Sequence, residues 1–270
     1  MGSRTEKNLS EAGQLVKGAM ERGLEIRLMG GGAVRVHCPK YAKVHEAMGR
    51  ELVDIDFVSL GKYRDRVKAY LTEAGYVPQW FDKMPSIEEM KKMKERVLVL
   101  ERGSLQRHVY YHQEKDITID IFYDKLEMCH TIDFKNRLTI DFPTVSLADM
   151  ILCKMQVVQL AEKDVQDMSV LLLEHPIGGT DSETINANYI SNILSNDWGF
   201  YHTITTNLKA IRDVFLKPDK IGEEGMSVVK TRLSELLDSI EGSPKSLKWK
   251  LRAQVGTKKI WYNEVENISA

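Results

Sequence analysis

The chain has little cysteine, no long apolar run and no excess of either charge. Its three cysteines, Cys38, Cys129 and Cys153, show no C-x-x-C spacing, so the sequence predicts neither a disulfide framework nor a zinc site. Sparse cysteine is typical of a reducing cytoplasm. No stretch reaches the roughly 18 apolar residues that cross a bilayer. The charged segment from Arg4 to Lys7 lacks the apolar region of a signal peptide. We therefore expect a cytoplasmic protein with no membrane partner.

The histidine spacing and the net charge argue against a histidine metal site and against a chain that is basic as a whole. The seven histidines show no H-E-x-x-H or comparable spacing, which argues against histidine-based metal chemistry. A formal net charge of -1 gives no global attraction to nucleic acid, although a basic patch can exist locally. The C-terminal region interleaves cations with aromatic residues: Lys245, Lys248, Lys250, Arg252, Lys258 and Lys259 with Trp249, Trp261 and Tyr262. This pattern fits either RNA contact or a solvated terminal helix whose tryptophans pack inward.

Hydrophobic spacing predicts an α+β protein with a mixed or antiparallel sheet and a helical C-terminal part. Up to Gly75 the expected order is helix 6–22, strand 24–29, a glycine turn, a helix starting at 33–37, an acidic strand at 53–57 and helix 62–74. A polar connection then covers 80–94, and strands are expected at 96–101, 108–112, 117–122 and 137–142. Beyond Ser146 the texture is helical, first with a stripe of Leu147, Met150, Ile151, Met155, Val158 and Leu160, then at 185–194, 204–216 and 228–240. Pro176, Gly178 and Gly179 suggest a boundary between a domain of residues 1–175 and a helical domain of residues 176–270.

Two aspartates one residue apart carry the first chemical signal. Asp54 and Asp56 are flanked by Val53, Ile55 and Phe57, and residues i and i+2 of a strand point to the same face. Carboxylates on an apolar strand are costly to bury unless they are paired or bind a cation. The spacing therefore predicts an oxygen site for a hard cation such as Mg²⁺, which usually shares its coordination shell with substrate phosphates. A solvated acidic edge strand is the structural alternative.

A glycine triplet and a third acid extend this prediction. Gly30, Gly31 and Gly32 follow a strand, where backbone N–H groups can come close to phosphates, although such glycines are also common in plain turns. Asp120 lies inside the apolar strand 117–122. Three strand-borne acids are what two-metal nucleotidyl transfer requires: two hold the metal on the triphosphate, and the third binds a second metal or deprotonates the attacking hydroxyl.

These motifs resemble the signature of the polymerase-beta-type nucleotidyltransferase superfamily. The later stretches 147–155 and 163–168 narrow the resemblance to the abortive-infection-type nucleotidyltransferases, which include toxins of toxin–antitoxin pairs. The resemblance covers roughly residues 24 to 175. It implies a nucleotidyltransferase fold, a small mixed sheet flanked by helices. The C-terminal third carries no such resemblance, and we expect it to form a helical domain that closes the acceptor cleft.

The resemblance also implies roles for individual residues. Gly30, Gly31 and Gly32 would bring the backbone to the triphosphate, and Lys154 would reach its phosphates as a point charge. Asp167, or Asp164 beside it, would orient that lysine or the acceptor. The metal ligands would be Asp54, Asp56 and Asp120, with Mg²⁺ or Mn²⁺ as the cofactor. The lysine and the two helical aspartates can also be ordinary charged residues on a half-buried helix. One departure is the long gap between Gly31 and Asp54, which requires an insertion or an extended helix.

The sequence therefore predicts a metal-dependent nucleotidyltransferase that moves a nucleoside monophosphate from a nucleoside triphosphate to an acceptor hydroxyl. The acceptor is tRNA or another RNA, a protein, or a small molecule, and a toxin-type member would have an antitoxin protein as partner. Two alternatives stay open. One is an aminoglycoside-like small-molecule nucleotidyltransferase, and the other is a non-catalytic nucleotide-binding interaction protein.

Overall fold

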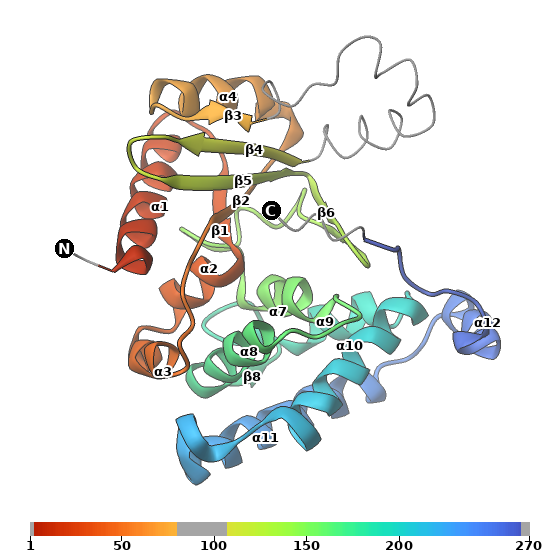
Figure 1. Ribbon diagram of the computed structural model, residues 1–270. Coiled ribbons are helices and arrows are strands. Elements are labelled where there is room, and N and C mark those ends of the chain that lie inside the picture. Colours follow the sequence, from red (N-terminus) through yellow and green to blue (C-terminus); the bar gives the residue numbers. More distant parts are fainter. Residues whose placement is uncertain (1–2, 80–106, 266–270) are drawn as a thin grey trace, which may run out of the picture. The chain divides into compact units, whose positions relative to one another are not determined.

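The computed structural model describes residues 3–79 and 107–265 (Figure 1). Contacts within the chain group it into two units that alternate along the sequence. The first unit comprises residues 1–33, 51–126 and 133–145, and the second comprises residues 34–50, 127–132 and 146–270. The helices that cover residues 147–174 group with the C-terminal helices. The division predicted at residues 175 and 176 stays a prediction.

A five-stranded mixed sheet forms the centre of the first unit. The strands follow the order β1-β2-β5-β4-β3, and β2 pairs with β5 in parallel while the other neighbours are antiparallel. Their bounds are β1 (Ile26–Met29), β2 (Ile55–Ser59), β3 (Val77–Pro78), β4 (Arg107–His112) and β5 (Ile117–Tyr123). The predicted α+β class with a mixed sheet is confirmed. The expected strand at 96–101 and the connection at 80–94 lie outside the described residues.

Helices α1 (Arg4–Glu21) and α4 (Arg64–Glu73) complete this unit, with the short helix η2 (Gly61–Tyr63) leading into α4. Ser3 caps α1 in a capping box with Glu6, which satisfies backbone N–H groups that a helix start leaves without partners. The apolar face of α1 is buried against β1 and β2 (Figure 1). The core of the sheet is apolar and fully buried, and includes Leu28, Ile55, Phe57, Ile119 and Ile121.

The second unit is almost entirely helical. Its elements are η1 (Pro39–Tyr41), α3 (Ala42–Ala47), α7 (Leu147–Met155), α8 (Glu162–Glu174), α9 (Ala187–Leu194), α10 (Trp198–Ala210), the π-helical η4 (Ile211–Phe215), α11 (Pro218–Gly242), α12 (Leu247–Val255) and η5 (Gly256–Lys258). Two short strands, β8 (Ile177–Gly178) and β9 (Ile185–Asn186), pair in parallel. The chain passes between the units within α2 (Gly30–His37), β6 (Lys125–Glu127) and β7 (Thr131–Asp133). No helix in the described part is long and apolar enough to cross a membrane.

One predicted strand and the end of one predicted helix are wrong. Residues 137–142 form turns, because their apolar side chains do not alternate into a core: Leu138 is buried, whereas Ile140 and Phe142 are partly exposed. The chain joins the sheet only afterwards, where the Leu28 N–H donates to Pro143 O and the Val145 N–H donates to Leu28 O.

Helix α7 provides the second correction. It starts directly after Ser146, as expected, and the Ser146 side chain caps it, but it ends at Met155. Val158 and Leu160 therefore lie beyond the helix and do not continue its buried stripe.

Candidate metal and nucleotide site

Three carboxylates converge at one end of the sheet in the first unit. Asp54 immediately precedes β2, Asp56 is the second residue of β2, and Asp120 lies in the middle of β5. One carboxylate oxygen from each of the three lies within 4.8 Å of those from the other two. The expectation that Asp54 lies within the strand is wrong, because the strand begins one residue later and leaves this side chain exposed. The three acids lie together, and their role as metal ligands stays a prediction.

The strand register explains why Asp56 and Asp120 meet. In the parallel pair β2–β5, Asp56 is the direct partner of Asp120. Directly opposed residues on neighbouring strands present their side chains to the same face of the sheet. Two aspartates at this register repel each other when both are ionised. A cation between them would remove that repulsion.

Gly30 gives Asp56 the space it occupies. The backbone of Gly30 adopts φ +64°, a left-handed conformation that side chains with a Cβ rarely adopt. A Cβ at this position would lie 3.0 Å from Asp56 Cγ and still closer to its Oδ2. Two separate reasons therefore favour glycine at this position: the left-handed backbone conformation and the space that the Asp56 carboxylate occupies.

The other two glycines differ from the expected turn. Gly31 and Gly32 belong to the first turn of α2, which follows β1 with no intervening loop. Backbone N–H groups in the first turn of a helix have no partner within the helix and attract anions. The predicted approach of the backbone to phosphates would therefore come from a helix N-terminus.

Asp120 is the most buried of the three acids, with 7% of its surface exposed. Its Oδ2 forms an ion pair with Arg107 at 2.6 Å, while its Oδ1 is buried and accepts no hydrogen bond within the described residues. Burial raises the pKa of Asp120, and the nearby Asp54 raises it further, while Arg107 acts in the opposite direction. A buried carboxylate oxygen without a donor is costly. A metal ion would satisfy it.

The donor set fits a hard divalent cation. All three side chains are carboxylates, which are the ligands that Mg²⁺ and Mn²⁺ prefer. The unpartnered Oδ1 of Asp120 and the space that Gly30 leaves for the Asp56 carboxylate are the structural observations that favour such an ion. The metal itself stays a prediction.

Lys154 and Asp167 form an ion pair within the second unit. The Lys154 Nζ lies 2.6 Å from Asp167 Oδ2 and 3.4 Å from Asp164 Oδ1. Only 1% of the Asp167 side chain and 11% of the Lys154 side chain are exposed. Burial favours the neutral lysine, but the two aspartates outweigh it and raise the pKa of Lys154. The lysine is therefore charged and held by the two acids of α8.

Two residues around Asp167 were missed by sequence reasoning. The Arg50 guanidinium donates to both carboxylate oxygens of Asp167, at 3.2 and 3.3 Å, and His45 Nε2 lies 3.4 Å from Oδ1. Burial alone would raise the pKa of Asp167, but Lys154, His45 and Arg50 together hold it well below its usual range. Both residues come from the segment between Gly31 and Asp54, whose only sequence signal was its unexpected length.

The predicted site residues thus fall into two clusters. Asp54, Asp56, Asp120 and Gly30 belong to the first unit, and Lys154, Asp164 and Asp167 belong to the second. Arg107, the partner of Asp120, was also missed because the predicted strand began one residue after it. The sequence did contain a signal for this pair: Arg107 directly precedes one predicted strand, and Asp120 lies in the next one. The role of Lys154 at phosphates stays a prediction.

Comparison with known proteins adds no further assignment. No protein-family model matches the chain, and no curated protein sequence matches it.

Proposed function

We propose that the protein is a metal-dependent nucleotidyltransferase whose first unit has the polymerase-beta-type fold. The observation that carries the proposal is the meeting of three carboxylates on and beside neighbouring parallel strands, with a helix N-terminus opening at Gly30. Each part matches a need of nucleotidyl transfer: carboxylates for the metal and backbone N–H groups for the triphosphate.

The chain's own residues divide the work as follows. Asp54 and Asp56 would bind the metal and the first turn of α2 would bind phosphate oxygens. The metal would supply positive charge against the charge that develops on the phosphates. The acceptor hydroxyl oxygen attacks the α-phosphorus, the bond from that phosphorus to the bridging oxygen breaks, and pyrophosphate leaves with the electron pair.

Asp120 is the residue suited to take the proton of the acceptor hydroxyl. Its burial raises its pKa and makes it a stronger base than an exposed aspartate. Arg107 holds one of its oxygens, which fixes the orientation of the carboxylate. The other oxygen has no hydrogen-bond donor among the described residues and is left for the hydroxyl or for a metal.

A second candidate function is nucleotide binding without turnover. The Arg107–Asp120 ion pair favours it, because an arginine on the third acid competes with both a second metal and a proton. This candidate predicts binding of the metal–triphosphate complex without release of pyrophosphate.

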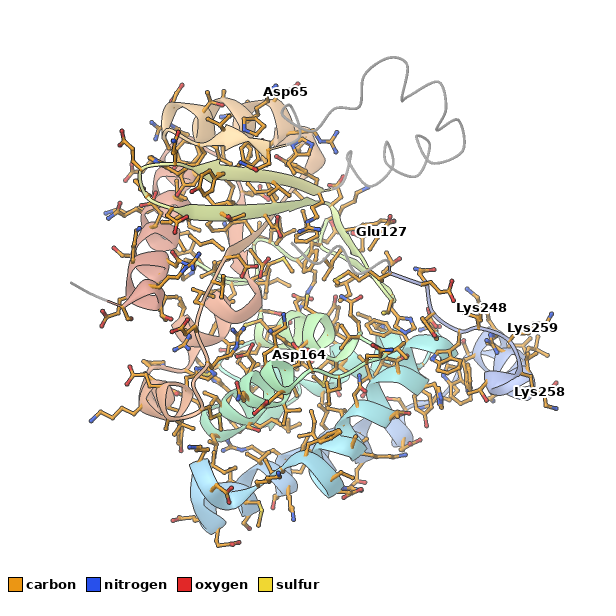
Figure 2. The ribbon with its side chains drawn as sticks, viewed as in Figure 1. Asp65, Glu127, Asp164, Lys248, Lys258 and Lys259 are labelled. Carbon is orange, nitrogen blue, oxygen red and sulfur yellow. The ribbon has the colours of Figure 1, made fainter. Side chains whose placement is uncertain are left out.

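The experiment is a transfer assay with each α-labelled nucleoside triphosphate in turn, Mg²⁺, and total RNA as acceptor, with the protein itself as a possible acceptor. The variants are Asp56→Asn and Asp120→Asn. Asp65→Asn is the matched control, because Asp65 is an exposed acid of the same unit on α4 (Figure 2). We expect labelled product with the wild type and the control, and a loss of about 100-fold or more with Asp120→Asn.

Each other outcome has a defined meaning. Pyrophosphate release without label in RNA or protein points to a small-molecule acceptor. Triphosphate binding with no release supports the non-catalytic candidate. Full transfer by Asp56→Asn contradicts the proposal.

A further inference from the structure

A tryptophan-lined cavity lies in the second unit, between the start of α10 and the segment that contains α12. Its volume is about 450 Å³, and its wall includes Trp198, Trp249 and Trp261 together with Leu251 and Arg252. Trp198 stacks on the parallel ring of His202, centred 5.0 Å away, and the Arg252 guanidinium lies 4.8 Å from the centroid of the Trp198 ring. The Trp261 indole N–H donates to Thr203 at 3.1 Å. The cavity is therefore a built feature with a fixed aromatic wall.

Large aliphatic side chains are exposed in the segment that lines this cavity, and Leu251 belongs to the cavity wall itself. Leu247 and Leu251, one turn apart on α12, expose 74% and 56% of their surface, and Ile260 exposes 66%. Single exposed aliphatic residues are common, but an exposed leucine in the wall of an aromatic cavity, with two more exposed aliphatic residues next to lining residues in sequence, is a feature typical of interaction sites. Tryptophan and arginine are also the residues that most often anchor protein interfaces.

The segment that contributes most of the aromatic wall is basic. Residues 243–262 contain six lysines and arginines and no acid: Lys245, Lys248, Lys250, Arg252, Lys258 and Lys259. Lys248, Lys258 and Lys259 lie at and just beyond α12 (Figure 2). These three and Lys250 are exposed and form no ion pair with any other residue that the structure describes. The one acid at the cavity, Asp197, is engaged as the N-cap of α10, where it accepts from the Phe200 N–H.

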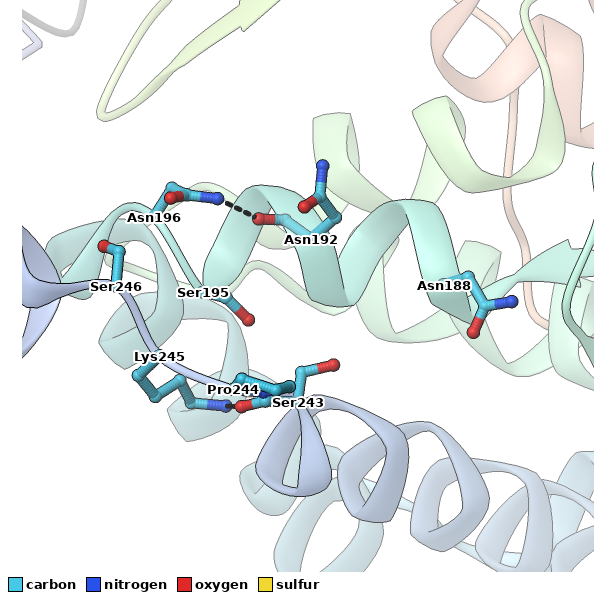
Figure 3. Close-up of a pocket in the computed structure, with 8 residues that line it drawn as sticks. All are labelled: Asn188, Asn192, Ser195, Asn196, Ser243, Pro244, Lys245 and Ser246. Atoms are coloured by element: carbon cyan, nitrogen blue, oxygen red, sulfur yellow. Dashed lines mark hydrogen bonds between the residues drawn. The ribbon is translucent and has the colours of Figure 1, made fainter.

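A second, polar cavity adjoins the aromatic one. It has a volume of about 400 Å³ and is lined by asparagines and serines, including Asn188, Asn192 and Asn196, along one side of α9 and the turn after it (Figure 3). Asn196 lines both cavities. Side-chain amides and hydroxyls offer donors and acceptors that suit a peptide backbone. Because they share Asn196, the two cavities are named together as the groove, with a polar and an aromatic half.

We propose that this groove binds an acidic peptide segment of a partner protein, with one large apolar side chain inserted among the tryptophans and carboxylates facing the lysines. The inference does not rest on the proposed function. Nucleic acid fits less well, because Trp198 is only 9% exposed and already contacts His202 and Arg252. The exposed Leu247, Leu251 and Ile260 give a base nothing to stack on. A lipid surface fits less well because it has no side chain to fill a cavity.

The test is selection of random displayed peptides on the chain of residues 1–270, followed by fluorescence anisotropy of the enriched peptides. We expect enrichment of peptides that combine Asp or Glu with one Leu, Phe or Trp, and affinity that falls with salt. Leu251→Asp and Lys248→Glu should each weaken binding about tenfold or more, which corresponds to about 1.4 kcal/mol. Both side chains are exposed, so neither change is expected to disturb folding.

Matched controls separate this surface from the rest of the unit. Val214→Asp changes an aliphatic side chain that is 67% exposed on η4, and Lys220→Glu reverses an exposed lysine on α11; neither should alter binding. Asp56→Asn should bind the peptides normally, so failure here and failure of the proposed function are distinguishable. Peptides without acidic enrichment, or peptides that bind Leu251→Asp as well as the wild type, overturn the proposal. Leu251-dependent binding of oligouridylate or of anionic vesicles, with no peptide binding, also overturns it.

Discussion

Asp56 on β2 is the direct register partner of Asp120 on β5 in a parallel strand pair. This relationship places two carboxylates on the same face of the sheet, and the turn before β2 adds Asp54 to them. The same register leaves Asp120 Oδ1 buried without a hydrogen-bond donor among the described residues. A divalent cation held by these acids would account for the close carboxylates and for the unpartnered Oδ1. Variants of Gly30, beside Asp56, and of Arg107, beside Asp120, test this site.

Gly30 should not tolerate a side chain. Gly30→Ala forces a left-handed backbone on alanine and drives its Cβ into the Asp56 carboxylate, so both stability and metal binding should fall. Gly23→Ala is the matched control: its φ is also +64°, but no atom lies within 4 Å of the added Cβ. The control should lose only the backbone cost of about 1–2 kcal/mol. Urea unfolding measures the loss of stability, and Mn²⁺ titration measures the loss of metal affinity. Equal losses in Gly30→Ala and Gly23→Ala would contradict this interpretation.

Arg107 should weaken metal binding in the wild type. Its guanidinium forms an ion pair with Asp120 at 2.6 Å and places a positive charge beside the proposed cation. Arg107→Ala should therefore raise the affinity for Mn²⁺ severalfold, as measured by electron paramagnetic resonance of the free ion. Arg66→Ala, an exposed arginine on α4, serves as the control and should leave the affinity unchanged. A weaker affinity in Arg107→Ala would show that the arginine supports the site.

The Lys154–Asp167 pair should show strong coupling. Lys154→Met leaves a buried Asp167 with one partner fewer and should cost about 3–5 kcal/mol of unfolding free energy. The double variant Lys154→Met/Asp167→Leu should lose clearly less than the two single variants added together. Lys163→Met, an exposed neighbour on α8, should stay within about 0.5 kcal/mol of the wild type. Additive single and double effects in urea unfolding would argue against a coupled buried pair.

His130 should make stability depend on pH. Burial lowers its pKa from 6.5 to about 4, and its Nε2 lies 2.8 Å from Thr203 Oγ1. Between these values the unfolded chain binds a proton that the folded chain does not. Its contribution is therefore complete above pH 6.5 and is lost as the pH falls toward 4, by up to about 3 kcal/mol. His130→Gln should reduce the slope of unfolding free energy against pH in this window. An unchanged slope would assign the acid sensitivity to other groups.

The sequence predicted those parts of the fold that depend on local patterns. The helix expected at 6–22, the strand expected at 117–122 and the helix expected after Ser146 each depend on patterns among neighbouring residues, and each was found near its expected place. The three acids of the site were predicted from the same local signals. Their approach to within 4.8 Å depends on the register of β2 against β5, which a strand pattern alone does not fix.

Contacts between distant segments account for what was missed. Arg50 meets Asp167 across more than one hundred residues of sequence, and Arg107 meets Asp120 across a hairpin, so neither could be paired in advance. The predicted strand at 137–142 failed because its apolar residues have no sheet edge to join until Thr144, which bridges to Leu28. The tryptophan cavity depends on α10 and α12 coming together, and only the composition of residues 243–262 hinted at it.

The most direct test of the account is binding of the Mn²⁺–nucleoside triphosphate complex, followed by electron paramagnetic resonance, with the wild type, Asp56→Asn and the control Asp65→Asn. The account predicts that the wild type and Asp65→Asn bind the complex and that Asp56→Asn loses this binding by tenfold or more, about 1.4 kcal/mol. Equal binding by Asp56→Asn, or no binding by the folded wild type, would contradict the assignment of the three carboxylates as a metal and nucleotide site.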